Sequence, residues 1–230
     1  MTNIPFSLVL AAGGMGTRMG VNVPKQYLHM RNKPIALFSF EIFLAMPELD
    51  QVVVVCDPIY QELFQKTAKS FSKKITFASP GIRRQDSVFN GIEKLNGDPL
   101  VCVHDAARPF ITMPIIRNVI ESAEKYGGSV VGVPLKATIK MCDNQKMIVS
   151  TPDRSKLWEM QTPQVVRLSL LKQGYAKAQA DNLTVTDDVS LLELIGKPAK
   201  VVEGSYFNIK ITTPDDLILS EQILDKYVLL

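Results

Sequence analysis

Residues that build disulfide frameworks and metal clusters are scarce in this sequence. The three cysteines, Cys56, Cys102 and Cys142, are odd in number and far apart, which argues against a disulfide framework and against a zinc site. Neither of the two histidines has a partner at metal-ligand spacing, and we interpret both as structural. Since two of the cysteines lie in apolar runs, we expect small buried side chains in a reducing compartment.

Long hydrophobic runs and blocks of like charge are missing as well. No apolar run reaches the roughly 18 residues that span a bilayer, and the first apolar run begins too close to Met1 for a signal peptide. The net charge is +3 with a pI near 8.7, without the dense Lys/Arg block of a nucleic-acid binder. We therefore expect a cytoplasmic protein with no membrane or nucleic-acid partner, whose ligand is a small anion.

The sequence does contain ample apolar material for one core, with 46% hydrophobic residues in 230 positions. Apolar runs without polar alternation predict buried strands, and runs with helical spacing predict helices between them. This alternation predicts a single α/β domain over residues 1–230, with a mostly parallel sheet and helices on both faces. We expect strands at 6–10, 51–56, 74–78, 100–103, 129–133 and 200–202, and helices at 34–46, 58–70, 84–95, 114–126, 168–179, 186–194 and from 213.

The pattern changes after the strand at 129–133. Alternating residues lead to a turn signal at Asp143-Asn144 and then to a second apolar stretch, so we interpret residues 135–156 as a β-hairpin arm. No helix is expected to cover this arm, and its exposed edges are most easily satisfied by pairing with a second copy. We therefore expect a homodimer through the arm, with residues 161–164 returning the chain to the core.

The most informative stretch runs from Leu10 to Lys25, directly after the first apolar run. It holds four glycines, which let a backbone turn sharply and approach an anion, together with the cations Arg18 and Lys25. Neither the Walker spacing nor the dinucleotide-binding spacing of glycines is present. The stretch predicts a phosphate site at the carboxyl end of a strand, and the alternative is an ordinary loop with two solvated cations.

A second candidate group follows the short strand at 100–103. Asp105 should lie at the same edge of the sheet as the glycine-rich stretch. A lone carboxylate there suits Mg²⁺, whose remaining ligands are phosphate oxygens and water. The alternative is that Asp105 pairs with Arg108 or caps the loop.

A third group consists of Arg154, Lys210 and the run Thr186-Asp187-Asp188. Taken singly, each of these residues is more often a helix cap or a surface charge. Together they would place an arginine, a lysine and a hydroxyl around one anionic group, as recognition of a phosphate and its polyol requires.

The order and spacing of these motifs resemble the 2-C-methyl-D-erythritol 4-phosphate cytidylyltransferase family of the non-mevalonate isoprenoid pathway. The similarity covers nearly the whole chain, and several motifs together are far more specific than any one of them. The motifs are Ala12-Gly-Gly-Met-Gly-Thr-Arg-Met, Pro24-Lys-Gln-Tyr-Leu, Val103-His-Asp-Ala-Ala-Arg-Pro, Asp153-Arg-Ser-Lys-Leu-Trp-Glu-Met-Gln-Thr-Pro-Gln, Thr186-Asp-Asp and Asn208-Ile-Lys-Ile-Thr-Thr-Pro.

This resemblance implies a Rossmann-like nucleotidyltransferase fold, dimerised through the arm, that transfers a cytidylyl group from CTP to methylerythritol phosphate and releases pyrophosphate. By position, Arg18 and Lys25 would hold the triphosphate and the charge that develops at the α-phosphorus. Asp105 would bind Mg²⁺, and Lys210 would lie near the attacking phosphate.

The resemblance also implies which residues bind the two substrates. Thr186 would contact methylerythritol phosphate, and Arg154 with Thr138 would reach it across the dimer. The segment Pro80-Gly81 and Ser87 would read the cytosine and the ribose. The small residues Ala11, Ala12 and Ala106 would leave space for the nucleoside, and Gly13, Gly14, Arg108, Thr162 and Asp187 complete the expected substrate contacts. Ile82 is a departure, since many relatives carry a polar or acidic residue there.

Two other functions compete with this hypothesis. Ribitol 5-phosphate cytidylyltransferase shares the glycine turn, the Pro-Lys-Gln motif and the Asn-Ile-Lys segment. Two features favour the methylerythritol enzyme, namely Ala106-Ala107 and the run from Asp153 to Trp158. A catalytically idle nucleotide-sensing module is disfavoured because Arg18, Lys25, Asp105 and Lys210 are all present.

Overall fold

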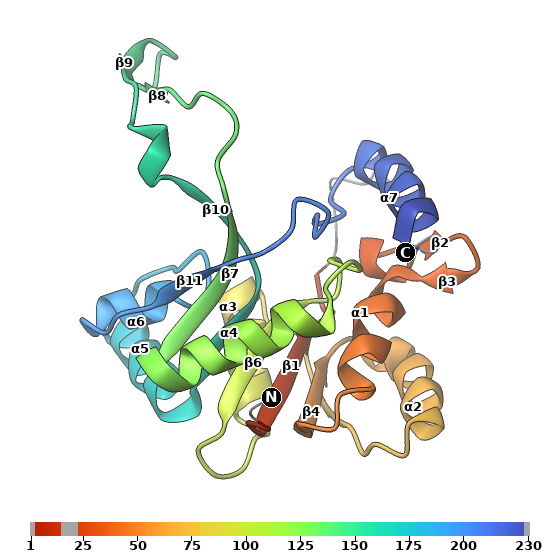
Figure 1. Cartoon of the computed structure of the whole chain (residues 1–230). Helices are drawn as coiled ribbons and strands as arrows, with labels where there is room; N and C mark the ends of the chain where they lie inside the picture. The colour runs from red at the N-terminus through yellow and green to blue at the C-terminus, as the bar shows by residue number, and fades with distance from the viewer. Residues whose placement is uncertain (1–2, 15–22, 228–230) are drawn as a thin grey trace.

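A seven-stranded sheet forms the centre of the computed structural model, which describes residues 3–14 and 23–227. The strand order is β11-β7-β10-β6-β1-β4-β5 (Figure 1). All neighbouring strands pair in parallel except β10, which is antiparallel to both β6 and β7. The strands are β1 (Phe6–Ala11), β4 (Leu49–Val55), β5 (Thr76–Ala78), β6 (Leu100–Asp105), β7 (Gly128–Pro134), β10 (Trp158–Arg167) and β11 (Lys200–Glu203). The predicted mostly parallel sheet is therefore confirmed.

Strand β10 is the element that sequence reasoning missed. Residues 161–164 were expected only to return the chain to the core, yet they lie in the middle of a ten-residue strand at the centre of the sheet. The pairing of β10 with β7 shifts register between Met160 and Gln164, and Pro163 lies inside this irregular stretch. A proline cannot donate to a regular ladder, so the sequence pattern resembled a connection rather than a central strand.

Helices cover both faces of the sheet, as the alternation of strands and helices predicts (Figure 1). On one face, Phe40, Phe43 and Phe64 pack with Leu8 of β1. On the other, Val88 packs with side chains such as Val9, which points away from Leu8 because successive strand residues alternate faces. The first face carries α1 (Ile35–Leu44), α2 (Gln61–Ser70) and α4 (Met113–Tyr126), and the second carries α3 (Arg84–Ile92), α5 (Leu168–Ala180) and α6 (Ser190–Leu194).

The remaining elements are short or peripheral. Helix α7 (Pro214–Tyr227) packs through Ile223 in a third apolar cluster with Met30 and Ile35. The short elements are η2 (Lys25–Tyr27), β2 (His29–Met30), β3 (Lys33–Pro34), η3 (Pro58–Tyr60), β8 (Met141–Cys142), β9 (Ile148–Ser150) and η4 (Arg154–Lys156). None of the helices in the described ranges combines the length and the apolar character needed to cross a bilayer.

Helix α3 lies unusually close to the sheet, which sets the position of its N-terminus. A Cβ atom added at Gly91 would meet Cγ1 of Val9 at 2.6 Å and Cγ2 of Val55 at 2.9 Å. Glycine is the residue that permits this approach of helix to strand. The contact fixes α3 against β1 and β4, so that its first residue, Arg84, stands beside the carboxyl end of β6.

The segment between β7 and β10, residues 135–157, projects away from the sheet; we call it the extension (Figure 1). Its two short strands β8 and β9 pair antiparallel. Apolar side chains at its tip are exposed, with Met147, Ile148 and Val149 at 65%, 64% and 61%. The expected pairing of this segment with a second copy stays a prediction.

Candidate active site

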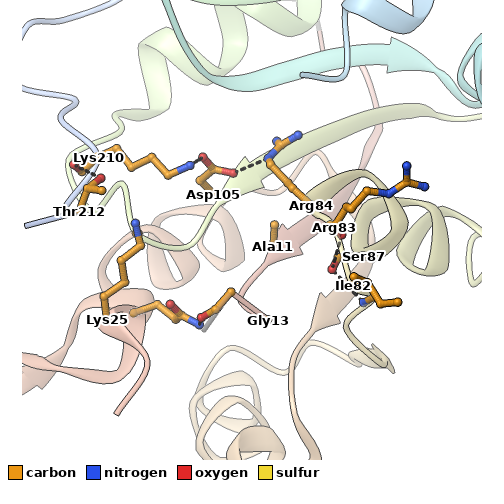
Figure 2. Close-up of a pocket in the computed structure, with 14 residues that line it drawn as sticks. Ala11, Gly13, Lys25, Ile82, Arg83, Arg84, Ser87, Asp105, Lys210 and Thr212 are labelled. Atoms are coloured by element: carbon orange, nitrogen blue, oxygen red, sulfur yellow. Dashed lines mark hydrogen bonds and ion pairs between the residues drawn. The ribbon is translucent and has the colours of Figure 1, made fainter. Parts of the chain in front are cut away.

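A cavity of about 340 Å³ lies at the carboxyl ends of β1 and β6 (Figure 2). Its walls come from the start of the glycine-rich stretch, from η2, from the N-terminal end of α3 and from the extended segment before α7. The expected site residues that line it are Ala11, Gly13, Gly14, Lys25, Gly81, Ser87, Asp105 and Lys210. Arg18, the other expected catalytic cation, lies outside the described residues.

Asp105 is the last residue of β6, and both of its carboxylate oxygens are paired. Oδ1 accepts a hydrogen bond from Nε of Arg84 at 3.1 Å, and Oδ2 contacts Nζ of Lys210 at 2.6 Å (Figure 2). Burial alone would raise the pKa of Asp105, but the attraction of Arg84 and Lys210 outweighs it and holds the pKa well below its usual value. The carboxylate is therefore ionised, and its side-chain partners are these two cations, not Arg108 as the alternative interpretation had it.

Arg84 continues the network to a second carboxylate. Its Nη1 and Nη2 donate to the two oxygens of Asp188 at 3.1 and 2.8 Å. Asp188 is fully buried, and its backbone N–H donates to Oε1 of Gln164 at 2.7 Å. Burial opposes the charge of Arg84, but the two carboxylates raise its pKa overall. Lys210, Asp105, Arg84 and Asp188 thus form a chain of alternating charge that runs from the lining of the cavity to the buried Asp188.

Lys25 stands on the opposite wall of the cavity, on the short helix η2. In Figure 2 its side chain points toward Lys210 and Thr212. The next two residues explain why it is held there. Gln26 donates to the carbonyls of Ala12 and Gly14 at 2.7 and 2.9 Å, and the hydroxyl of Tyr27 donates to the carbonyl of Ala12 at 2.7 Å. The Pro-Lys-Gln-Tyr motif therefore fastens Lys25 to the start of the glycine-rich stretch.

The third wall is built mainly from backbone. The hydroxyl of Ser87 accepts from the N–H of Gly81 at 2.9 Å and donates to the carbonyl of Arg83 at 3.2 Å. A Cβ atom at Gly81 would approach Cβ of Asp86 to 2.4 Å, so only glycine fits this turn. The side chain of Ile82 is fully exposed at the mouth of the cavity. No side-chain hydrogen bond to a base is therefore available from position 82.

A buried network supports Asp105 from behind. The hydroxyl of Thr162 accepts from the N–H of Asp105 at 3.0 Å and donates to Nδ1 of His104, whose Nε2 donates to the carbonyl of Arg108. Burial lowers the pKa of His104 to about 4, so the ring is neutral at physiological pH, which fits this pattern of one accepting and one donating nitrogen. The interpretation of His104 as structural agrees with this geometry.

A second cavity of about 370 Å³ adjoins the first. Lys210 and Thr212 line both cavities, while Arg108 and Glu159 line only the second. Nη1 of Arg108 donates to the carbonyl of Asn208 at 2.8 Å, and its Nε has no hydrogen-bond partner among the described atoms. Because Arg108 lines the second cavity, its guanidinium can bind an anionic or hydroxyl group there.

Several expected site residues lie away from the first cavity. Ala12, Ala106 and Thr162 are buried behind its wall. Asp187 caps α6, because its Oδ1 accepts from the N–H of Ser190 at 3.0 Å, and Thr186 beside it is exposed. Thr138 and Arg154 lie on the extension, where Nη1 of Arg154 donates to the carbonyl of Lys136 at 2.7 Å. The substrate contacts expected of these residues remain predictions.

Residues 6–226 match the sequence model described as 2-C-methyl-D-erythritol 4-phosphate cytidylyltransferase, IspD. The chain belongs to this family. The chloroplastic enzyme of Oryza sativa subsp. japonica is 49% identical over 96% of this chain and 74% of its own length. The Chlamydia pneumoniae enzyme is 42% identical over 96% of this chain and its entire length.

Solved structures of the IspD family share the fold. The 4-diphosphocytidyl-2C-methyl-D-erythritol synthase of Anaerococcus prevotii superposes with a TM-score of 0.87 at 25% identity, covering 97% of each chain. The Francisella tularensis enzyme has a TM-score of 0.79 at 30% identity, covering 95% of this chain and 99% of its own. The resemblance inferred from the sequence motifs is therefore confirmed at the level of family and fold.

A divalent cation would fit this IspD site at Asp105. The described residues contain no cluster of three or more His, Cys, Asp or Glu side chains that could hold a metal ion by themselves. A single ionised carboxylate at the floor of a cationic cavity instead suits Mg²⁺, which binds through one or two carboxylates and completes its shell with phosphate oxygens and water.

Arg84 is the residue of this IspD site that sequence reasoning overlooked, and Asp188, named only as part of the run after Thr186, was not predicted to be its partner. The adjacent arginines Arg83 and Arg84 come one residue after Pro80-Gly81 and before an apolar helical face. Two cations at the start of a helix, where the helix dipole does not favour them, signal a partner carboxylate or an anion. Only the fold reveals that this partner is Asp188, 104 positions further along the chain.

Proposed function

We propose that the chain is a cytidylyltransferase that transfers the cytidylyl group of CTP to 2-C-methyl-D-erythritol 4-phosphate. The products are 4-diphosphocytidyl-2-C-methyl-D-erythritol and pyrophosphate, a step of isoprenoid precursor biosynthesis. The observation that carries this function is the cavity at the ends of β1 and β6, which gathers Lys25, Arg84 and Lys210 around Asp105 in a chain of the IspD family. The low net charge of the chain and its cationic cavity support small anionic substrates and no nucleic-acid partner.

The reaction is an in-line displacement at the α-phosphorus of CTP. An oxygen of the methylerythritol phosphate attacks this phosphorus, the bond to the β-phosphate bridging oxygen breaks, and pyrophosphate leaves with that electron pair. The attacking group is already an anion, so no general base is needed. The main obstacle is the repulsion between two polyanions, which cations fixed around the cavity reduce.

Each cation has a proposed role in this displacement. Lys25 and Arg18 hold the triphosphate and the charge that develops on it, and the N–H groups of Gly13 and Gly14 add partial positive charge. Lys210 faces the attacking phosphate. Its position on the wall shared by the two cavities supports this role, because it can contact a group in either one.

Mg²⁺ is the proposed cofactor, with Asp105 as its protein ligand. When bound, it supplies Lewis-acid polarisation of the phosphate oxygens. The chain's own part is to present an ionised carboxylate whose backbone N–H is tied down by Thr162.

The nucleoside is proposed to occupy the wall formed by Ala11, Gly81 and Ser87, with the small Ala12 and Ala106 directly behind it. Backbone groups line most of this wall, which supports recognition of the base by N–H and carbonyl groups. The polyol phosphate is proposed to bind near Arg108, Thr162, Thr186 and Asp187. The place of Arg108 in the wall of the second cavity supports this placement.

The working enzyme is proposed to be a cytoplasmic homodimer of one nucleotidyltransferase domain, residues 1–230, joined through the arm at residues 135–156. Thr138 and Arg154 would then contact the methylerythritol phosphate in the site of the other copy. The exposed apolar tip of the extension supports an interface there. The projection of the extension from the sheet supports a contact in trans (Figure 1).

Incubation of the purified chain with CTP, methylerythritol phosphate and Mg²⁺ tests the proposed function. We expect pyrophosphate release and a product with the mass of the cytidine diphosphate ester. A parallel assay contains ribitol 5-phosphate, and faster turnover with this polyol would replace the function by the competing one. CTP binding without turnover of either polyol phosphate would identify a nucleotide-sensing module.

A further inference from the structure

The two cations on Asp105 are held in different ways. Arg84 uses three nitrogen atoms on two carboxylates, Asp105 and Asp188. Lys210 contacts Asp105 through its single ammonium group. A divalent cation can still use the second lone pair of either carboxylate oxygen, but its charge repels both cations, so we expect the more weakly held contact to open.

We propose that Arg84 is a positioning residue that fixes Oδ1 of Asp105, and that Lys210 is a placeholder cation on Oδ2 that the divalent cation displaces. This inference rests on the proposed function, because it concerns the metal site of that reaction. To the proposed mechanism it adds a role for Arg84. It also adds the replacement of Lys210 by the divalent cation at Asp105, before any bond in the substrates changes.

Arg84 is the fixed partner because everything around it is anchored. Asp188 is 1% exposed, and its backbone is held by Gln164 at 2.7 Å. The close contact of Gly91 with β1 and β4 fixes the helix that begins with Arg84. Release of Arg84 from Asp105 would also disturb the buried charge of Asp188, which has a high cost in a dry interior.

Lys210 is the exchangeable partner because only its side chain has to move. The chain is held on both sides of Lys210. Before it, the side-chain Nδ2 of Asn208 donates to the carbonyl of Thr162 at 3.0 Å, and after it the backbone N–H of Ile211 donates to the carbonyl of Ala107 at 2.9 Å. The Lys210 side chain is 35% exposed, against 28% for Arg84, so the two cations differ mainly in their number of contacts. Lys210 lines both cavities, so a released ammonium group reaches the second cavity without a change in the fold.

The exchange has a measurable consequence, because a competing cation weakens the binding of a metal ion. Removal of Lys210 should therefore tighten metal binding, although it should also lower turnover. Removal of Arg84 should act in the opposite direction, because Asp105 then loses the contact that fixes its orientation. A purely electrostatic effect would instead make both variants bind the metal more tightly.

The experiment is a titration of the full-length, nucleotide-free chain with Mn²⁺, with free Mn²⁺ measured by electron paramagnetic resonance. We expect Lys210→Met to bind Mn²⁺ at least about fivefold more tightly than wild type, a typical size for coupling between two ligands of one group. Lys25→Met is the matched control, because Lys25 carries the same charge and lines the same cavity but lies on a different element, η2. Its Mn²⁺ affinity should change by less than about twofold, as screening by water weakens indirect effects.

A charge-neutral double variant tests the part of Arg84. Arg84→Met combined with Asp188→Asn removes one positive and one negative charge and leaves no buried carboxylate unpaired. We expect its Mn²⁺ affinity to fall by at least about threefold, and kcat to fall with little change in KM for CTP, as for an interaction made mainly in the transition state. Thermal unfolding of the double variant shows whether the fold is retained.

The results separate this inference from the proposed function. Unchanged Mn²⁺ affinity in Lys210→Met, or equal tightening in Lys25→Met, would overturn the exchange. Mn²⁺ binding by the double variant as tight as that of wild type would overturn the positioning role of Arg84. Turnover of wild type with CTP and methylerythritol phosphate is measured on the same preparation. A lack of turnover would contradict the proposed function, whereas the Mn²⁺ affinities of the variants would still test the inference.

Discussion

The cavity and the extension are opposite kinds of surface within one chain. At the cavity, charged side chains are largely buried and matched within the chain, as the series Lys210, Asp105, Arg84 and Asp188 shows. On the extension, Ile148 and other apolar side chains are more than half exposed, and no apolar cluster of the core includes them.

This difference shows where the single chain pairs its own charged groups and where it leaves apolar side chains exposed to a partner. Buried charges are tolerated at the cavity because several elements converge there and neutralise them. The apolar tip of the extension gains nothing from the same chain, which is the usual mark of an interaction surface.

The largest expected effect is on the cations of the cavity. Lys25→Ala should lower turnover by about 10²-fold or more, because a positioned charge on the reacting phosphates is lost while the core is untouched. Arg18→Ala should behave in the same way. Pyrophosphate release under saturating CTP measures the effect, with Lys66→Ala on the exposed face of α2 as the control. A near-normal rate in Lys25→Ala would remove this residue from the mechanism.

The buried His104 behind the cavity should make the unfolding free energy depend on pH. Burial lowers the pKa of His104 from 6.5 to about 4, so between these values the unfolded chain binds a proton that the folded chain does not. Stability should therefore be constant above pH 6.5 and fall as the pH drops toward 4, by up to about 3 kcal/mol from this group.

Chemical denaturation at several pH values measures this loss. The variant His104→Asn should have a shallower pH dependence than wild type, whatever its stability at neutral pH. His29→Asn at the exposed second histidine is the matched control. A pH dependence that His104→Asn leaves unchanged would show that other groups cause it.

Much of the fold follows from apolar runs that sequence reasoning can detect. Strands such as β1 and β4 are covered on both faces, so their residues are almost uniformly apolar and easily predicted. Strand β10 was not predicted because Pro163 and two glutamines interrupt its pattern. Its place at the centre of the sheet depends on long-range pairing with β6 and β7, which no local pattern contains.

The site divides in the same way. Lys25 and Lys210 were predicted from the motifs that carry the resemblance, and Asp105 was predicted also because it lies at the end of a strand, at the edge of the sheet where ligands collect. Arg84 was not predicted to belong to the site, since its partner Asp188 lies 104 positions away and nothing local marks the pair. Charge pairs between distant segments are made by packing, which is why their geometry emerges only with the fold.

A smaller effect is expected on the extension, where mixing the variants Arg154→Ala and Lys25→Ala should restore part of the activity that each has lost. If Arg154 acts in the site of the other copy, Arg154→Ala and Lys25→Ala homodimers each lack intact sites. Mixed dimers would contain one intact site, so an equal mixture should regain about a quarter of wild-type activity after subunit exchange. Activity that never exceeds the sum of the two variants would place Arg154 in its own site or outside the mechanism.

The smallest effects are expected from a valine-to-threonine substitution, made once in the buried sheet and once on the exposed extension. Val54→Thr in β4 puts a hydroxyl into a fully buried position and should cost about 1–3 kcal/mol of unfolding free energy. Val149→Thr, at a position that is 61% exposed in β9, should change the unfolding free energy of the single chain by less than about 0.5 kcal/mol. If the extension joins two copies, the same Val149→Thr should shift sedimentation toward the monomer at low protein concentration. A dimer that is indifferent to Val149→Thr, and to shortening of residues 135–150, would place the interface elsewhere and leave the exposed tip without this partner.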